Sequence, residues 1–204
     1  MDLPVVPLGR PRPERADAVR NREHLLATVR EMLAEQGPEA VTMDGLAERA
    51  GLGKGTVFRR FGTRAGIFRA LLDADETEFQ RRVLEGPPPL GPGAGPEERL
   101  TAFGRHRIAF LFAHHAVARA AVDRGLTVPA GEAPFSRQHI RVLLGLAVPD
   151  LPHLDHLAVQ LSAALEGPTL LYVALPRTPA EPPEGTAAAF ADTWTHLVER
   201  LLRP

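Results

Sequence analysis

The stretch TMDGLAERAGLGKGTVFRRF, from Thr42 to Phe61, decides the fold of the N-terminal part of the chain. Thr42 is of a type that caps helices, and the apolar residues after it recur at helical spacing until Gly51 stops the run. A turn over residues 51–53 then leads into a second short helix, residues 54–61, whose Val57 and Phe61 fall on one side. Two short helices joined by a turn that contains glycine predict a helix-turn-helix.

The outer side of the second short helix carries residue types that contact DNA. Lys54, Arg59 and Arg60 neutralise phosphates, and an arginine also forks onto the O6 and N7 atoms of guanine. Thr56 offers a hydroxyl and a methyl group, and Gly55 lets the backbone approach a base or a phosphate closely. An ordinary helical pair with solvated charges is the alternative, and helical periodicity alone would not exclude it.

Helices are also predicted on both sides of the motif. Residues 16–36 have apolar side chains at helical spacing and end at Gly37 and Pro38. Thr63 caps a further helix that continues to Glu85. Four prolines in the first thirteen residues predict an extended arm, with little order before Ala16. Arginines of this arm either reach the minor groove or a phosphate, or stay in solvent; they are Arg10, Arg12 and Arg15.

The segment GPPPLGPGAGP, residues 86–96, consists almost entirely of helix breakers and predicts a linker at a domain boundary. Five helical segments follow it, within residues 96–116, up to 123, 135–146, 154–175 and 187–202, and no strand pattern is evident. We therefore predict an all-α fold of about nine helices. The predicted parts are an arm (1–16), a DNA-binding domain (17–62), a connecting helix (63–85), a linker (86–96) and a ligand-binding and dimerisation domain (97–204).

Composition agrees with a globular protein of 204 residues, because 44% of the residues are hydrophobic and 24% are charged. No apolar run is long enough to span a bilayer, the N-terminus lacks the order of a signal peptide, and there is no cysteine. We expect a cytoplasmic protein. The net charge is −1, but residues 1–64 hold 11 basic and 9 acidic residues against 13 and 16 in the remainder. Phosphate binding requires basic residues on one surface and not a high total.

The ordered pattern T-x-x-x-L-A-x-x-A-G-x-x-x-G-T-x-F-x-x-F-x-T-R, from Thr42 to Arg64, resembles the TetR family of bacterial regulators. The helix before the pattern and residues 63–72 extend the resemblance to roughly a third of the chain. It implies nine helices: three for DNA, a fourth that connects, and a C-terminal domain that binds a small inducer and dimerises. It identifies the protein as a DNA-binding transcriptional regulator, with repression as the default mode.

Carried over residue by residue, the resemblance implies phosphate contacts from Thr42, Lys54, Arg60 and Arg64. It implies base-edge contacts from Gly55, Thr56 and Arg59. Phe58 departs from the pattern, because the family usually has a tyrosine there whose hydroxyl reaches a phosphate. Phe58 therefore has a steric or apolar role at this surface. Arg60 stands where the family often has histidine, which keeps or increases the positive charge.

The helix after the linker places two polar residues among aromatic ones, as a pocket for a small ligand requires. The resemblance puts the inducer site among these helices, and each candidate residue is otherwise an ordinary core or packing residue. The candidates are Phe103, Arg107, Phe110, His114 and Glu166. Glu166 precedes Gly167 and Pro168 within a helical run, which predicts a kink.

Two apolar stripes in the C-terminal half are wider than one small domain obviously needs. By resemblance, the two helices that carry them pair with their copies in a four-helix dimer interface, although an intramolecular core would also account for them. The predicted interface residues are Leu154, Leu157, Leu161, Leu165, Phe190, Trp194, Leu197, Val198 and Leu201.

We expect no metal, cofactor or catalytic site. Adjacent His114 and His115 point about 100° apart on a helix, and His153 and His156 follow a proline at a helix start, where exposed polar residues are ordinary. The sequence has no phosphate loop, nucleophile elbow or paired-carboxylate signature. Two alternatives from other classes are a helical enzyme and a helical protein-interaction module that does not bind DNA.

Overall fold

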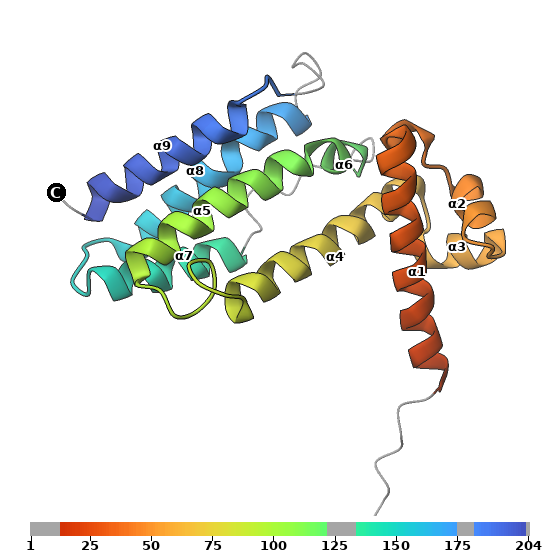
Figure 1. The fold of residues 1–204 in the computed structure, drawn as a ribbon, viewed down its shortest axis with the longest axis horizontal. Helices are drawn as coiled ribbons and strands as arrows, with labels where there is room; N and C mark the ends of the chain where they lie inside the picture. Colours follow the sequence, from red (N-terminus) through yellow and green to blue (C-terminus); the bar gives the residue numbers. More distant parts are fainter. Residues whose placement is uncertain (1–12, 122–133, 175–181, 203–204) are drawn as a thin grey trace, which may run out of the picture. The chain divides into compact units, whose positions relative to one another are not determined.

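The computed structural model describes residues 13–121, 134–174 and 182–202 of the chain (Figure 1). These residues form helices and connecting segments without strands, which confirms the predicted all-α class. The elements in chain order are α1 (Pro13–Gln36), the 3₁₀ helix η1 (Pro38–Ala40), α2 (Met43–Arg49), α3 (Lys54–Phe61), α4 (Arg64–Glu85), α5 (Pro96–Ala113), α6 (His115–Ala120), α7 (Pro134–Ala147), α8 (Leu154–Ala174) and α9 (Thr186–Leu202).

The chain divides into two compact units, residues 1–71 and 72–204. The division between the units falls within α4, which runs continuously from one unit into the other, and not at residues 86–96. The predicted linker belongs to the second unit, because its Leu90 is buried in that unit's core and the amide of Gly91 donates to the carbonyl of Pro87. Proline and glycine mark non-helical backbone, but they do not distinguish a spacer from a packed loop.

The first unit is built around the buried sides of α1 to α4. Leu25 and Val29 of α1 are buried, as are Leu46 of α2 and Phe68 of α4. Helix α1 begins at Pro13, three residues before the predicted end of the arm; a proline is well suited to the first turn of a helix, where no backbone donor is needed. Residues 1–12 of the predicted arm lie outside the described residues.

In the second unit, α5 packs against α9, α7 and α8, and α8 packs against α7 and α6 (Figure 1). Trp194 of α9 is buried, and its indole N–H donates to the carbonyl oxygen of Leu100 at 3.1 Å. A Cβ atom on Gly104 would lie 2.0 Å from the same indole nitrogen, so α5 and α9 approach closely because residue 104 has no side chain.

The dimer interface stays a prediction, and this packing buries some of the residues that were predicted to form it. Four of the predicted interface residues are buried in the subunit's own core: Leu161, Leu165, Trp194 and Val198. They are not accessible to a second copy, because the wide apolar stripes of α8 and α9 also cover α5. Of the remaining predicted residues, Leu197 is 42% exposed, and Leu154, Leu157, Phe190 and Leu201 are half-buried.

His139 of α7 is a buried titratable group in this core, with its ring 4.8 Å from that of Phe103 and stacked on Phe135 at 5.7 Å. Its Nε2 atom has no hydrogen-bond partner among the described residues. Burial, helped by the positive charge of Arg99, lowers the pKa of His139 to about 4. The native core therefore holds this imidazole neutral, whereas the unfolded chain protonates it near its ordinary pKa.

The pH dependence of stability tests this environment. As the pH falls from 6.5 towards 4, His139 is protonated in the unfolded state but stays neutral in the native state. The free energy of unfolding therefore decreases across that pH range. Between pH 7 and pH 5 we expect the wild type to lose about 2 kcal/mol more unfolding free energy than His139→Leu. Urea unfolding followed by the fluorescence of Trp194, the single tryptophan, measures both. Equal losses in the two proteins would contradict a neutral buried histidine.

Candidate nucleic-acid interface and buried polar cluster

Local hydrogen bonds hold α2 and α3 in the predicted helix-turn-helix. The hydroxyl of Thr42 caps α2 by accepting from the amide of Gly45 at 3.0 Å. The amide of Leu52 donates to the carbonyl of Ala47 at 3.0 Å, and Gly51 has a φ of 64°, which glycine adopts without strain. These bonds leave the hydroxyl proton of Thr42 available for a phosphate oxygen.

One side of helix α3 is buried and the other side faces solvent. Val57 is fully buried and Phe61 is 9% exposed, so these two side chains set the rotation of the helix. The predicted DNA-contact residues of α3 all lie away from that side: Lys54, Gly55, Phe58, Arg59 and Arg60 are exposed, and Thr56 is half-buried. A Cβ atom on Gly55 would meet no other atom within 4 Å. The backbone at this position is therefore open to a close approach.

The basic residues of this surface differ in what they already bind. Lys54 Nζ lies 3.0 Å from Asp44 Oδ2, in an ion pair whose two side chains are exposed. Arg60 donates to the carbonyl oxygen of Ala18 on α1 at 2.8 Å. On this surface, the ammonium of Lys54 is paired with Asp44 and the guanidinium of Arg60 is hydrogen-bonded to α1. The guanidinium of Arg59 has no ion pair among the described residues.

Arg64 has a structural role. Its guanidinium donates to the carbonyl oxygens of Val41 at 2.8 Å and Pro38 at 2.6 Å, and it lies over the ring of Phe68 at 5.0 Å. These contacts join the start of α4 to the segment before α2. The phosphate contact that the resemblance implies for Arg64 competes with them.

A cleft of about 170 Å³ lies between α1 and α3, and sequence reasoning did not anticipate it. It brings Asn21 of α1 next to the basic residues of α3. An exposed polar residue on an amphipathic helix carries no mark in the sequence, so only the packing of α1 on α3 identifies Asn21. The lining residues are Ala18, Asn21, Leu25, Thr56, Arg59 and Arg60.

The second unit contains a buried charged cluster centred on Arg107 of α5, which is 5% exposed. Arg107 lies 2.5 Å from a carboxylate oxygen of Glu76 and 3.2 Å from one of Glu166. Its guanidinium carbon lies 5.5 Å from the ring centre of Phe79 and 5.4 Å from that of Phe110. Two carboxylates and two aromatic rings thus surround one permanent cation.

His114 extends the cluster towards α4. Its Nε2 lies 3.1 Å from Asp75 Oδ2, its Nδ1 lies 2.7 Å from the carbonyl oxygen of Phe110, and its ring centre is 4.2 Å from that of Phe110. The structure therefore brings Arg107, Phe110, His114 and Glu166 together, while Phe103 lies beside them in the core, 6.0 Å from Phe79.

The contributions of α4 to this cluster escaped sequence analysis. Helix α4, which the sequence predicts only as a connecting helix, carries Asp75, Glu76 and Phe79. Acidic residues on a long helix usually face solvent. Within the described part of the unit, the Nε atom of Arg107 is buried without a hydrogen-bond partner. The interior of the cluster is thus polar and not fully satisfied.

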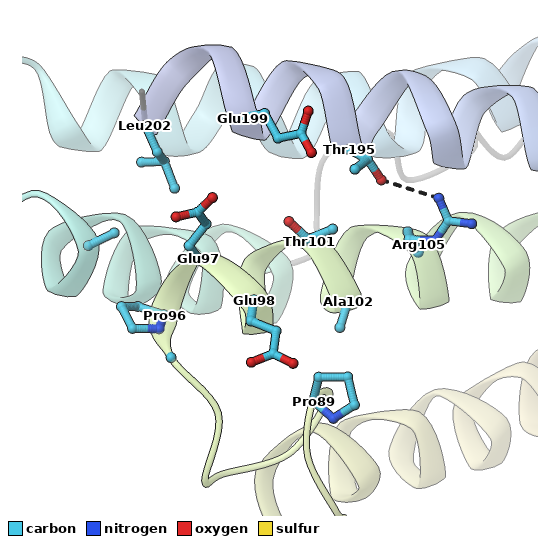
Figure 2. Close-up of a pocket in the computed structure, with 12 residues that line it drawn as sticks. Pro89, Pro96, Glu97, Glu98, Thr101, Ala102, Arg105, Thr195, Glu199 and Leu202 are labelled. Atoms are coloured by element: carbon cyan, nitrogen blue, oxygen red, sulfur yellow. Dashed lines mark hydrogen bonds between the residues drawn. The ribbon is translucent and has the colours of Figure 1, made fainter. Parts of the chain in front are cut away.

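A separate groove of about 720 Å³ lies between the start of α5, the end of α9 and the loop before α5 (Figure 2). Glu97 and Glu98 lie in the first turn of α5, where carboxylates stabilise the positive end of the helix dipole. Arg105 donates to Thr195 at 3.2 Å and pairs with Asp192 at 2.8 Å, which ties α5 to α9 beside the groove. These contacts give the polar lining a structural explanation.

The described residues, 13–121, 134–174 and 182–202, bear on metal binding and on membrane crossing. They contain no group of three or more histidine, aspartate or glutamate side chains placed to hold a metal ion, and the rings of His153 and His156 lie 6.3 Å apart. None of the helices in these segments has the length and apolar character needed to cross a membrane.

Comparison with known proteins follows this geometry. Residues 25–71 match the sequence model of the bacterial regulatory proteins of the tetR family. No curated protein matches the chain. A TetR-family transcriptional regulator from Pectobacterium atrosepticum is similar in structure, with a TM-score of 0.65, 18% identity, and coverage of 95% of this chain and 96% of that one.

Two further solved structures share the fold. A regulator of the TetR/AcrR family from Thermobifida fusca has a TM-score of 0.58 and 20% identity, and the match covers 90% of this chain and 97% of that one. A tetR-family regulator from Streptomyces coelicolor has a TM-score of 0.56 and 21% identity, with 90% and 79% covered.

An N-terminal helix-turn-helix followed by a helical C-terminal unit defines the class of helical DNA-binding regulators. Residues 25–71 match the N-terminal sequence model of the tetR family, and the chain shares the fold of solved TetR-family transcriptional regulators, in agreement with the resemblance inferred from its sequence.

The cluster around Arg107 makes a prediction about stability. Arg107→Met leaves Glu76 and Glu166 without their shared cation, and we expect a loss of about 3 kcal/mol of unfolding free energy, at the low end for buried pairs because Glu76 is partly exposed. The triple variant Glu76→Gln, Arg107→Met, Glu166→Gln removes all three charges, and we expect it to recover at least half of that loss. Urea unfolding at pH 7 measures both. A triple variant as unstable as Arg107→Met would assign the loss to packing of the arginine stem.

Proposed function

We propose that the protein is a sequence-specific DNA-binding transcriptional regulator that acts in the cytoplasm as a homodimer, represses from a palindromic operator and is released by a small-molecule effector. The observation that carries the proposal is the outward side of α3, which presents basic and small residues over a buried Val57 and Phe61. An α-helix of this kind fits the major groove of B-DNA.

In this proposal α3 is the recognition helix. Gly55, Thr56 and Arg59 face base edges, while Lys54 and Arg60 contact phosphates on either side, with Thr42 at the start of α2 as a further phosphate donor. The openness at Gly55 and the unpaired state of Arg59 support this division of roles. Phe58, 50% exposed, gives the surface an apolar contact for a thymine methyl group or a sugar.

A dimer accounts for the apolar residues that remain exposed on the second unit. Val159 of α8 is 49% exposed and Leu197 of α9 is 42% exposed, and half-buried leucines lie on the same helices. Two recognition helices related by a two-fold axis read successive major grooves about 34 Å apart, so the operator is expected to be a near-palindrome.

The buried cluster around Arg107 is the proposed effector site. It combines aromatic walls with a few polar groups, as small-molecule sites do. Three of its residues, Asp75, Glu76 and Phe79, belong to α4, which continues into the first unit. An effector that changes the partners of Arg107 therefore acts on the helix that carries the DNA-binding unit. Because such coupling is reciprocal, operator DNA weakens the binding of the effector by the same factor by which the effector weakens DNA binding.

Footprinting of genomic fragments retained by the purified protein tests the function. We expect a protected near-palindrome spanning two adjacent major grooves, with retention that falls steeply as salt rises. Retention without sequence preference would reduce the protein to a general DNA binder. No retention at any salt would favour a protein-interaction module or an enzyme.

The ion pair between Asp44 and Lys54 makes a prediction about affinity. Asp44→Asn removes a negative charge from the DNA-facing surface and releases Lys54, so we expect tighter binding to every duplex, by up to about fivefold. Lys54→Met should weaken binding to every duplex and lower the salt slope by about one. Fluorescence anisotropy with operator and unrelated duplexes measures both effects.

The matched control for Asp44→Asn is Glu23→Gln, which removes the same charge from an exposed position on α1. Equal effects of the two variants would mean that net charge alone, and not the pairing with Lys54, controls the affinity.

A further inference from the structure

The cleft between α1 and α3 is built like an anion site. Its floor includes the buried Leu25, and its rim carries the amide of Asn21, the hydroxyl of Thr56 and the guanidinium groups of Arg59 and Arg60. None of its lining residues is acidic. Asp17, one turn before Asn21 on α1, is paired with Arg20. The cleft is therefore lined by two guanidinium groups and no carboxylate, and hydrogen-bond donors line its rim.

The periodicity of α3 places Arg60 and Arg59, which both line the cleft, on different lines of the helix. Thr56 and Arg60 are four residues apart and share the flank that faces α1, as the cleft's lining shows. Arg59 lies about 100° around the helix from Arg60, opposite the buried Val57 and Phe61. Arg59 therefore lies on the outermost line of the helix and reaches the edge of the cleft, whereas Arg60 belongs to the flank.

The contact between Arg60 and α1 fixes the guanidinium in place. One terminal nitrogen donates to the carbonyl oxygen of Ala18 at 2.8 Å, and Ala18 is three residues before Asn21 on the same helix. The remaining donors of Arg60 belong to the same cleft lining as the side chain of Asn21. A pre-positioned guanidinium loses less conformational entropy on binding an oxyanion than a free one does.

We propose that this cleft binds one phosphodiester group of the DNA backbone, with Asn21 and Arg60 as its donors, so that α1 is a second DNA-contacting element beside α3. The inference rests on the proposed function, because it places a backbone phosphate next to the recognition helix. The contact carries no base information: it fixes the register of α3 in the groove, while Arg59 on the neighbouring line reads a base.

The test introduces the same charge at two positions of α1. Asn21→Asp places a carboxylate in the cleft, and Gln36→Glu places one at the exposed end of the same helix, fifteen residues or about 22 Å away. Both positions are exposed, so both variants should fold, which a thermal melt verifies. Binding is measured by anisotropy on an operator duplex and on an unrelated duplex, across a salt series.

We expect Asn21→Asp to weaken binding to the two duplexes by the same factor, about tenfold, and to lower the salt slope by about 0.9. Gln36→Glu should change affinity by less than about twofold. Arg60→Met should behave like Asn21→Asp, whereas Arg59→Met should weaken the operator more than the unrelated duplex. Equal effects of Asn21→Asp and Gln36→Glu would overturn the proposal.

A second measurement separates this proposal from the proposed function. Inorganic phosphate is titrated into the protein without DNA, and the side-chain amide signal of Asn21 is followed by NMR in the wild type and in Arg60→Met. Duplex binding that is weakened by Asn21→Asp supports the backbone phosphate as the ligand. A phosphate-dependent shift in a protein that binds no duplex would retain the anion site, assign it to a free phosphate and reject the DNA role. No shift and no duplex binding would reject both.

Discussion

One helix is built into two separate hydrophobic cores, and the rest of the structure depends on it. The first part of α4 buries Ile67, Phe68 and Leu71 in the first unit, and its second part buries Phe79 and Val83 in the core of the second unit. Burial of such side chains contributes about 1.5–3 kcal/mol each, so both ends of α4 are firmly held. The two units are therefore joined by a continuous helix, and each unit's core holds one part of it.

The sequence predicts the helix-turn-helix well because the motif is local. Apolar spacing and glycine position set Val57 and Phe61 inward, and the structure confirms this by burying both. It also predicts that Arg107, Phe110, His114 and Glu166 have a common role, and the structure brings them together. It does not reveal Glu76 or Asn21, because a polar residue on a helix is chemically the same whether water or another helix faces it.

Two features of the packing could not be predicted from the sequence, for the same physical reason. The apolar stripe that contains Trp194 and Val198 has the same spacing whether it covers α5 or a second subunit, and only the packing against Gly104 decides for α5. Similarly, the Pro-rich and Gly-rich segment before α5 breaks helices both as a spacer and as a packed loop, and the burial of Leu90 decides for the loop. Periodicity and breaker residues describe an element, whereas its neighbours lie elsewhere in the sequence.

The basic residues of the two units differ in burial, and this difference bears on regulation. In the first unit, Lys54, Arg59 and Arg60 are exposed and can exchange their present contacts for phosphates at little cost. In the second unit, Arg107 is buried and shared between Glu76 on α4 and Glu166 on α8, so separating it from either carboxylate is expensive unless another group replaces the lost partner. Effector coupling in proteins is typically about 1–3 kcal/mol, which is comparable to the cost of breaking one such pair. A ligand that substitutes for Glu76 would remove that cost and free Arg107 of α5 from α4 within the second unit.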